Sequence, residues 1–211
     1  GYDRYGGVCN IIPNAGVCAL AMCYGAGDFA RTVEIATMCS WDTDCNAGNV
    51  GTILGVACGL EGLPAHYRDP INDEIVLSGI SGYLNILDIP SYAWELARWG
   101  YLLRGEPVPE EVSGRVREGE VYFDFSLPGS THGLRFACDV PTCARLRDGS
   151  VLLDRMVRGQ KAKLFYKPFW RRADFSDERY TPVFSPRAYP GQQVEMRLRY
   201  EKLAGELLIL T

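Results

Sequence analysis

The sequence predicts an α+β chain of two regions, a helical region over residues 1–105 and an antiparallel, β-sandwich-like region over residues 115–211. Apolar residues recur at helical spacing in the first region and alternate in the second. Six of the eight cysteines lie within the first 58 residues, whereas the first lysine is Lys161. The segment at 106–114 is rich in proline, glycine and acid, and we expect it to link the two regions.

Four segments of the first region are typical of helices. Residues 15–24 are almost wholly apolar, which indicates a helix that is buried on most sides. Asp28 is a suitable N-cap for the next helix, FARTVEIATMCS at 29–40. Two more helices are expected over residues 46–59 and 91–104.

Alternating segments predict the strands of the second region. They are VYFDFSL at 121–127, AKLFYKPF at 162–169 and QVEMRLRY at 193–200, and the turn-forming triplets PGS, RDG and YPG separate them. LPGSTHGLR at 127–135 groups a serine, a threonine and a histidine, but it lacks the GxSxG pattern of a nucleophile elbow. We therefore expect this stretch to be a hairpin connection.

Charge and cysteine usage restrict the function classes. The net charge is −4, and the basic residues of the second half are dispersed among acids, which does not predict nucleic-acid binding. No apolar run is long enough to predict a membrane span. The cysteines form no CxxC pair, and His66 and His132 have no partners at ligand spacing, so no zinc site is expected. We expect reduced, mostly buried thiols and a cytoplasmic protein. The ends of the chain, Gly1 and an apolar GELLIL before Thr211, predict a fragment of a longer protein.

The stretch CSWDTDCNAGNVG at 39–51 carries two carboxylates two residues apart, Asp42 and Asp44. Such a pair suits a hard divalent cation, but either acid is equally suited to cap the helix that follows. A calcium loop of the EF-hand type is excluded, because Ala47 and Ile53 stand where that loop needs glycine and glutamate.

Four glycines follow the acids at helical spacing: Gly48, Gly51, Gly55 and Gly59. Each glycine inside a helix costs about 1 kcal/mol relative to alanine. A stripe of four therefore predicts that another backbone approaches this helix closely, and that the helix is central and holds the preceding acids rigidly.

The whole stretch WDTDCNAGNVGTILGVACGLEGLP at 41–64 resembles the C-terminal signature of the ADP-ribosylglycohydrolase family, and the weaker resemblance extends over residues 6–105. The resemblance implies the truncated C-terminal part of an all-helical domain. It also implies a binuclear Mg²⁺ centre that hydrolyses the N- or O-glycosidic bond between ADP-ribose and an acceptor. Carried over by position, Asp42 and Asp44 are catalytic metal ligands, and Cys45 takes a place that normally holds a hydroxyl-bearing ligand.

The family completes its metal centre with a second acidic cluster, and the first half of this chain offers none. The sequence therefore predicts half of a metal site. Asn10, Asn14, Trp41 and Asn46 are candidate contacts for ADP-ribose or an ADP-ribosylated substrate. A turn with a helix cap is the simpler interpretation of Asn10 and Asn14, and a place in the core is the simpler one for Trp41.

Two alternatives stay open. A glycosidase that works with two carboxylates alone is the weaker one, because acids two apart in one loop seldom lie on both sides of a sugar bond. The second is a non-catalytic module whose β region binds carbohydrate or protein, for which the aromatic and arginine-rich segment at 179–194 is the candidate surface.

Overall fold

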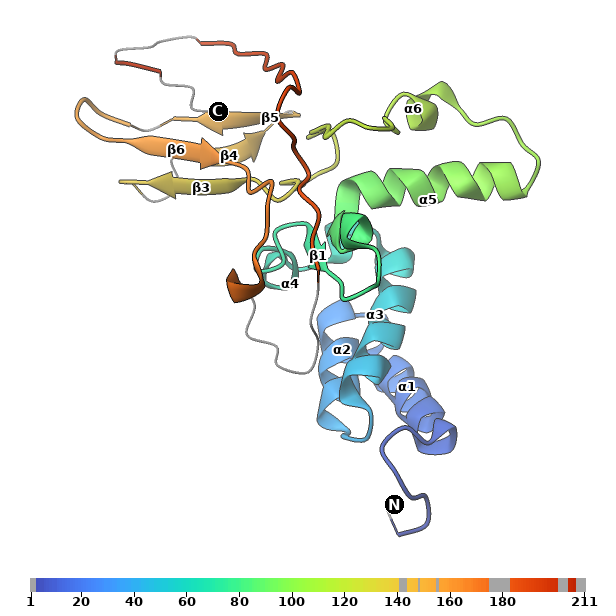
Figure 1. The fold of residues 1–211 in the computed structure, drawn as a ribbon. Helices are drawn as coiled ribbons and strands as arrows, with labels where there is room; N and C mark the ends of the chain where they lie inside the picture. The colour runs from blue at the N-terminus through green and yellow to red at the C-terminus, as the bar shows by residue number, and fades with distance from the viewer. Residues whose placement is uncertain are drawn as a thin grey trace. The chain divides into compact units, whose positions relative to one another are not determined.

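The computed structural model describes residues 3–140, 144–147, 149–154, 156–174, 183–200 and 205–207. The chain divides into two compact units, Gly1–Pro70 and Ile71–Thr211 (Figure 1). Each unit is considered by itself below. The domain boundaries predicted at residues 105 and 115 stay a prediction.

The first unit is helical, as the sequence predicts. It contains three long helices, α1 (Ile11–Gly25), α2 (Phe29–Met38) and α3 (Thr43–Cys58), followed by the short elements η1 (Leu60–Gly62) and α4 (Ala65–Arg68). Helices α1 and α3 begin a few residues earlier than expected, and α2 ends at Met38, before the expected residue 40. A break after the first helix is present at residues 26–28. Within the part of the chain that the structure describes, no helix is long and apolar enough to cross a membrane.

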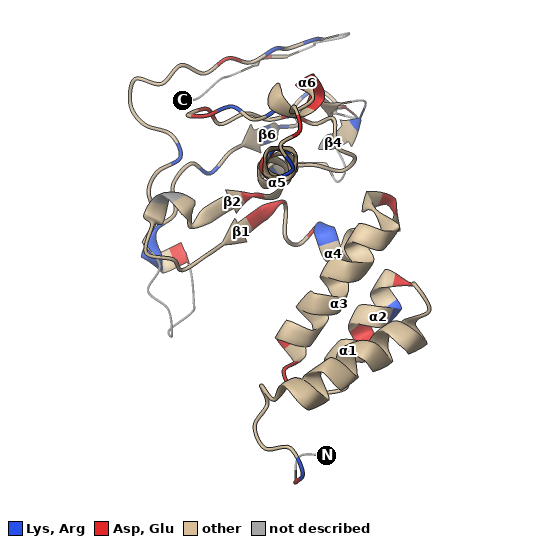
Figure 2. Cartoon of the chain, turned by 90° about the vertical axis from the view of Figure 1, so that its right-hand side faces the viewer, with Lys and Arg blue, Asp and Glu red and all other residues tan. Residues whose placement is uncertain are grey.

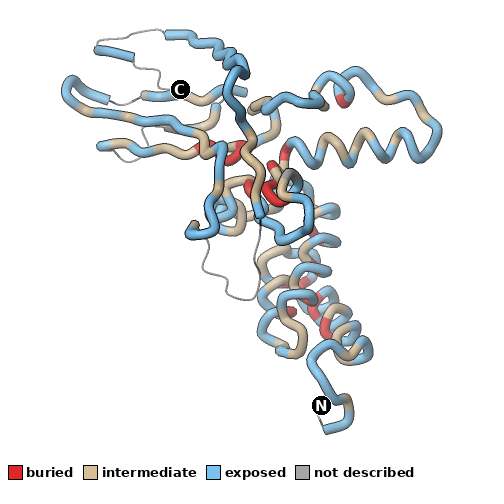
Figure 3. Tube along the Cα trace, viewed as in Figure 1, coloured by how far each residue is buried: buried red, intermediate tan, exposed pale blue. Residues whose placement is uncertain are grey.

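The core of this unit is small and lies where the three helices meet. Val17 and Ala21 of α1, Ala36 of α2 and Val50 of α3 are buried together. Figure 3 shows these few buried positions on the inner sides of the helices, whose outer sides are exposed. Large apolar side chains are therefore left in solvent, for example Val56, which is 85% exposed.

The turn between α1 and α2 follows from three local features. Ala26 adopts the left-handed conformation (φ 53°) that ends α1. The Asp28 carboxylate accepts the backbone N–H of Arg31 at 2.7 Å, so the predicted N-cap is confirmed. A Cβ atom on Gly25 would come within 2.9 Å of the Cα atom of Thr32 and overlap its side chain. Only a glycine allows the two helices to approach this closely.

The close packing predicted for the glycines of α3 is wrong for the described residues. A Cβ atom on Gly48, Gly55 or Gly59 would meet nothing within 4 Å. One on Gly51 would touch Val33 and Phe29 only at ordinary van der Waals distance. The stripe is therefore mostly open, and α2 reaches it only at Gly51, at ordinary contact distance.

The expectation of mostly buried thiols is also wrong. The six cysteines of the first unit are free, but Cys9, Cys23 and Cys45 are exposed and the other three are only partly buried. The apolar sequence around Cys23 predicts burial, but the helix turns this face to solvent. In the second unit Cys138 is disulfide-bonded, so the chain is not wholly reduced.

The second unit combines helices with short antiparallel sheets. Strands β1 (Glu74–Val76) and β2 (Ile86–Asp88) pair with each other, and the short η2 (Gly82–Leu84) precedes β2. The all-helical character predicted for residues 1–105 is therefore wrong for residues 74–88. Helix α5 (Ile89–Leu103) confirms the helix predicted over 91–104. The short helix α6 (Glu110–Ser113) lies in the predicted linker.

Two more sheets follow. Strand β3 (Arg135–Cys138) pairs with β6 (Ala162–Phe165), β4 (Ala144–Arg147) pairs with β5 (Ser150–Leu153), and η3 (Arg172–Asp174) ends the described elements of this part. Each of the three sheets has two strands among the residues that the structure describes, and a β-sandwich stays a prediction.

Three strand-related expectations fail. Residues 121–127 form no strand beyond an isolated bridge from Phe125 to Gly149, and residues 193–200 form none. Because residues 121–127 are not a paired strand, the stretch at 127–135 is not a hairpin connection. Alternation indicates which residues suit a sheet, but a strand forms only where a partner offers hydrogen bonds in register.

Candidate functional site

The acidic loop enters α3 through a strained turn. Ser40 and Trp41 both have a φ of 66°, a conformation that non-glycine residues rarely adopt. Asp42 occupies the N-cap position of α3, but its side chain makes no cap hydrogen bond. The capping interpretation of Asp42 is therefore not realised, and its carboxylate remains available for another partner.

A compact group of potential metal ligands forms at this helix start. One ligand atom from each of Asp42, Asp44 and Cys45 lies within 4.8 Å of the others. Figure 2 shows acidic positions where the chain enters α3, on helices that are otherwise almost uncharged. Asp44 also accepts the Cys45 backbone N–H at 3.0 Å, which fixes the local turn. Among the residues that the structure describes, no other such group of three was found.

Cys9, in the segment before α1, lies outside this group but contacts Asp42, and no local sequence pattern predicts that contact. Its thiol donates a hydrogen bond to the Asp42 carboxylate, and so does the thiol of Cys45. The charge of Asp42 and then this hydrogen bond raise the pKa of Cys9, and the same two causes in the reverse order raise the pKa of Cys45. Asp44 adds to both effects through its charge.

Asn14 ties together the segments that carry these ligands. Its amide donates to the carbonyl oxygen of Val8 at 3.0 Å, next to Cys9. Its Oδ1 accepts the Asp42 backbone N–H at 3.4 Å and the Asn46 side-chain amide at 3.1 Å. Asn46 is buried, and its own oxygen accepts the Cys18 thiol at 3.7 Å. One side chain therefore fixes the loop before α1 against the start of α3.

The remaining predicted substrate contacts have structural partners. Asn10 is the N-cap of α1, and its Oδ1 accepts the Ile12 N–H at 3.1 Å. Trp41 packs against the core of the first unit. The simpler interpretation is thus confirmed for both residues. A substrate-contacting role for Asn10, Asn14, Trp41 and Asn46 stays a prediction.

The donor set is chemically mixed. The carboxylates of Asp42 and Asp44 suit Mg²⁺, which prefers oxygen ligands. The thiols of Cys45 and Cys9 do not, because sulfur is a soft donor that favours metals such as zinc. The residues present therefore fit a divalent metal, but only two of them fit Mg²⁺.

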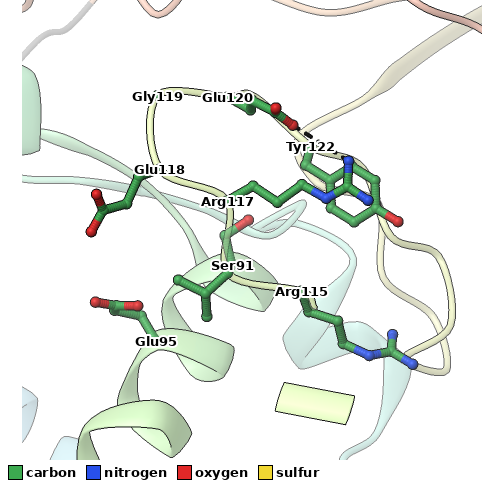
Figure 4. Close-up of a pocket in the computed structure, with 9 residues that line it drawn as sticks. Ser91, Glu95, Arg115, Arg117, Glu118, Gly119, Glu120 and Tyr122 are labelled. Carbon is green, nitrogen blue, oxygen red and sulfur yellow. Dashed lines mark hydrogen bonds and ion pairs between the residues drawn. The ribbon is translucent and has the colours of Figure 1, made fainter. Parts of the chain in front are cut away.

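A pocket of about 220 Å³ lies in the second unit, between α5 and the loop at 115–122 (Figure 4). Figure 4 shows the guanidinium of Arg117 over the ring of Tyr122, and its ion pair with Glu120 spans 3.4 Å. Glu95 of the lining forms an ion pair with Arg98. Glu95, Arg117 and Glu120 of the lining are thus each in an ion pair, and none of the predicted site residues line the pocket.

The second unit also holds a buried ionisable pair that the sequence did not reveal. The Nδ1 atom of His132 lies 2.7 Å from a carboxylate oxygen of Asp88, and both side chains are almost fully buried. Its Nε2 atom lies 2.7 Å from the carbonyl oxygen of Asp124. The ring nitrogens are therefore both occupied, which makes this histidine structural. Forty-four residues separate the pair, so no local spacing signals it.

A known protein family matches the segment that contains the acidic loop. Residues 2–102 match the family model described as ADP-ribosylglycohydrolase. No curated protein and no solved structure matches the chain. The matched segment contains the ligand group at the start of α3 and ends one residue before the end of α5. The segment from residue 2 to residue 102, just under half of the chain, is therefore similar to the ADP-ribosylglycohydrolase family.

Proposed function

We propose that this chain provides part of a metal-dependent hydrolase that cleaves the N- or O-glycosidic bond between ADP-ribose and its acceptor. The observation that carries the proposal is the convergence of Asp42, Asp44 and Cys45 within 4.8 Å, inside the segment that matches the family. Exposed acidic groups are common without a metal, so the position of this group inside the matched segment is what supports the proposal.

Asp42 and Asp44 would hold the metal, and the resemblance implies Mg²⁺. A divalent ion in such a centre polarises the bond to be broken and lowers the pKa of a bound water. This chemistry explains a site that has carboxylates and no nearby histidine. The carboxylates lie at the N-terminal end of α3, where the helix dipole attracts negative charge.

The chain's own residues arrange this site through the start of α3. The strained turn at Ser40 and Trp41 directs Asp42, and the Asn14 amide group holds its backbone. The family's metal centre is built from two acidic clusters, and Asp42 and Asp44 supply one of them. The proposal therefore includes a second acidic cluster from outside these residues. ADP-ribose or an ADP-ribosylated substrate is the proposed partner.

The test is release of ADP-ribose from an ADP-ribosylated peptide, followed by chromatography with and without divalent metal. It uses the full chain, alone and as part of any longer open reading frame that contains it. Asp42→Asn should abolish metal-dependent release while leaving the helix content unchanged. Asp69→Asn removes an exposed acid of the same unit and should leave release intact.

Two outcomes would contradict the proposal. Unchanged release in Asp42→Asn would exclude this carboxylate from the reaction. Binding of ADP-ribose without any hydrolysis, in a chain supplied with metal and the second acidic cluster, would favour the non-catalytic binding module instead.

A further inference from the structure

The thiols beside the acidic loop disagree with a magnesium centre. Cys45 belongs to the group whose ligand atoms lie within 4.8 Å of one another, and Cys9 hydrogen-bonds to the same Asp42 carboxylate. We propose that this site takes a thiophilic divalent ion of the Zn²⁺ class in preference to Mg²⁺, held by the converged group Asp42, Asp44 and Cys45, with Cys9 moving in as the fourth ligand. The inference rests on the proposed function, since it concerns the metal of that same site.

The coordination chemistry favours the thiophilic ion. Zn²⁺ accepts four ligands in a tetrahedron and combines thiolate with carboxylate, whereas Mg²⁺ requires near-octahedral oxygen coordination. Two thiols and two carboxylates supply the number and type of ligands for the first geometry. For Mg²⁺ the same set offers only two oxygen-bearing side chains, and its two sulfurs are ligands that Mg²⁺ does not favour.

The two thiols are also free to bind. Both cysteines are free and exposed, so a metal reaches them without opening the core. Cys9 lies in a turn that follows Gly6 and Gly7, and a Cβ atom on either glycine would meet nothing within 4 Å. This segment therefore has room for the small movement that brings a thiol from a hydrogen bond to a metal bond.

The segments that carry the ligands are held together without a metal. Asn14 bonds to the carbonyl oxygen of Val8 at 3.0 Å and to the backbone N–H of Asp42 at 3.4 Å. Cys9 follows Val8 directly, and Asp44 lies two residues after Asp42. The Asn14 hydrogen bonds keep Cys9 beside the acidic loop. Two surface thiols that met by chance would not need such a bridge between their segments.

The test is a titration of the reduced 211-residue chain with Cd²⁺, followed by the thiolate-to-metal charge-transfer absorption. Saturating bands are expected at one ion per chain. Cys9→Ser and Cys45→Ser should each remove about half of the band, because each removes one of two thiolates. The matched control, Cys23→Ser, changes an exposed thiol near the other end of α1 and should leave the band unchanged.

Competition measures the preference. Zn²⁺ should displace Cd²⁺ at low excess, whereas Mg²⁺ should not displace it even at high excess. Loss of a residue that only hydrogen-bonds to a metal ligand typically lowers metal affinity by roughly 10- to 100-fold. Cys45→Ser removes a ligand itself, so the affinity for Zn²⁺ should fall by more than this. The hydroxyl of the new serine should raise the affinity for Mg²⁺ relative to Zn²⁺.

The results separate this inference from the proposed function. A band that persists in the Cys9→Ser, Cys45→Ser double variant, or displacement of Cd²⁺ by equimolar Mg²⁺, overturns the inference. If Mg²⁺ still supports ADP-ribose release that depends on Asp42, the proposed function stands. A cysteine-dependent band supports the metal site, and the absence of release in Zn²⁺, Mn²⁺ or Mg²⁺ from a chain supplied with the second acidic cluster contradicts the hydrolase.

Discussion

At the scale of single residues, the functional candidates depend on one asparagine. Asn14 makes three hydrogen bonds that join the segment before α1, the acidic loop and the buried Asn46. A buried polar group without a hydrogen-bond partner destabilises the fold, because it has lost its bonds to water and gained none in return. Loss of the Asn14 side chain should therefore lower the stability of the unit and also disturb the geometry of the site.

Replacement of Asn14 by alanine should lower the free energy of unfolding by about 1–3 kcal/mol, because the Asn46 amide loses its acceptor. Urea unfolding checks the value. Thr37→Ala removes an exposed side chain of α2 and should change stability by less than about 0.5 kcal/mol. Equal effects of the two variants would show that the Asn14 bridge contributes nothing.

Asp174 gives a pH-dependent prediction. The backbone N–H of Arg171 and then the Lys167 ammonium lower the pKa of this carboxyl to about 2. Because the pKa is lowered on folding, its stabilising effect is present above the usual value of 3.8 and is lost as the pH falls toward 2. Asp174→Asn should therefore destabilise the chain at neutral pH.

The difference from wild type should shrink as the pH drops through this window, which urea unfolding over a pH series measures. Glu195→Gln is the control, because Glu195 is largely exposed and forms a long ion pair of 3.7 Å with Arg197. A destabilisation of Asp174→Asn that is equal at all pH values would exclude its charge as the cause.

At the scale of elements, the helices of the first unit were predictable and the role of their glycines was not. Asp28 and the glycine-containing break before it are local signals, so the start of α2 follows from the sequence. Which glycine another helix approaches depends on how the helices are rotated. The close approach occurs at Gly25, outside the conspicuous stripe.

Alanine substitutions at two glycines should have opposite effects. Gly25→Ala should destabilise the chain by about 1–3 kcal/mol, because the new methyl group overlaps Thr32 and strains the α1–α2 turn. Gly48→Ala should stabilise it by about 1 kcal/mol, since its methyl group meets open space within a helix.

Thermal and urea unfolding of both variants test this pair. Destabilisation by Gly48→Ala would show that another backbone covers the stripe in solution, as the sequence predicts. A neutral Gly25→Ala would show that α1 and α2 separate easily.

At the scale of the whole molecule, the chain consists of two compact units with different stabilising interactions. The first has an apolar core of few residues. The second buries the His132–Asp88 pair, whose carboxylate also accepts the Ser91 hydroxyl at 2.7 Å. Breaking a buried pair by removing one partner leaves a charge without compensation.

His132→Leu should therefore lower the stability of the second unit by about 3–5 kcal/mol. Hydrogen exchange followed by mass spectrometry measures the effect in each unit. Amides of residues 71–140 should lose protection, whereas those of α1, α2 and α3 should keep theirs. Equal loss in both units would show that they unfold as one.

The double variant Asp88→Leu, His132→Leu is the control for a lost charge partner. Replacing both members of a buried pair by apolar residues is often nearly neutral, so this variant should recover part of the stability lost in His132→Leu. No recovery would indicate that packing around the His132 ring dominates.

The sequence alone determined the helices of the first unit and α5, the cap at Asp28, the position of the acidic loop and the family resemblance of residues 2–102. These depend on signals within a few residues of one another, which hold in any tertiary context. The tertiary structure decided that residues 121–127 lack a strand partner, that His132 meets Asp88 and that Cys9 meets Asp42. Each of these contacts joins segments far apart in the chain. Their formation depends on how whole elements pack, because the free energy of packing is not encoded in any one segment.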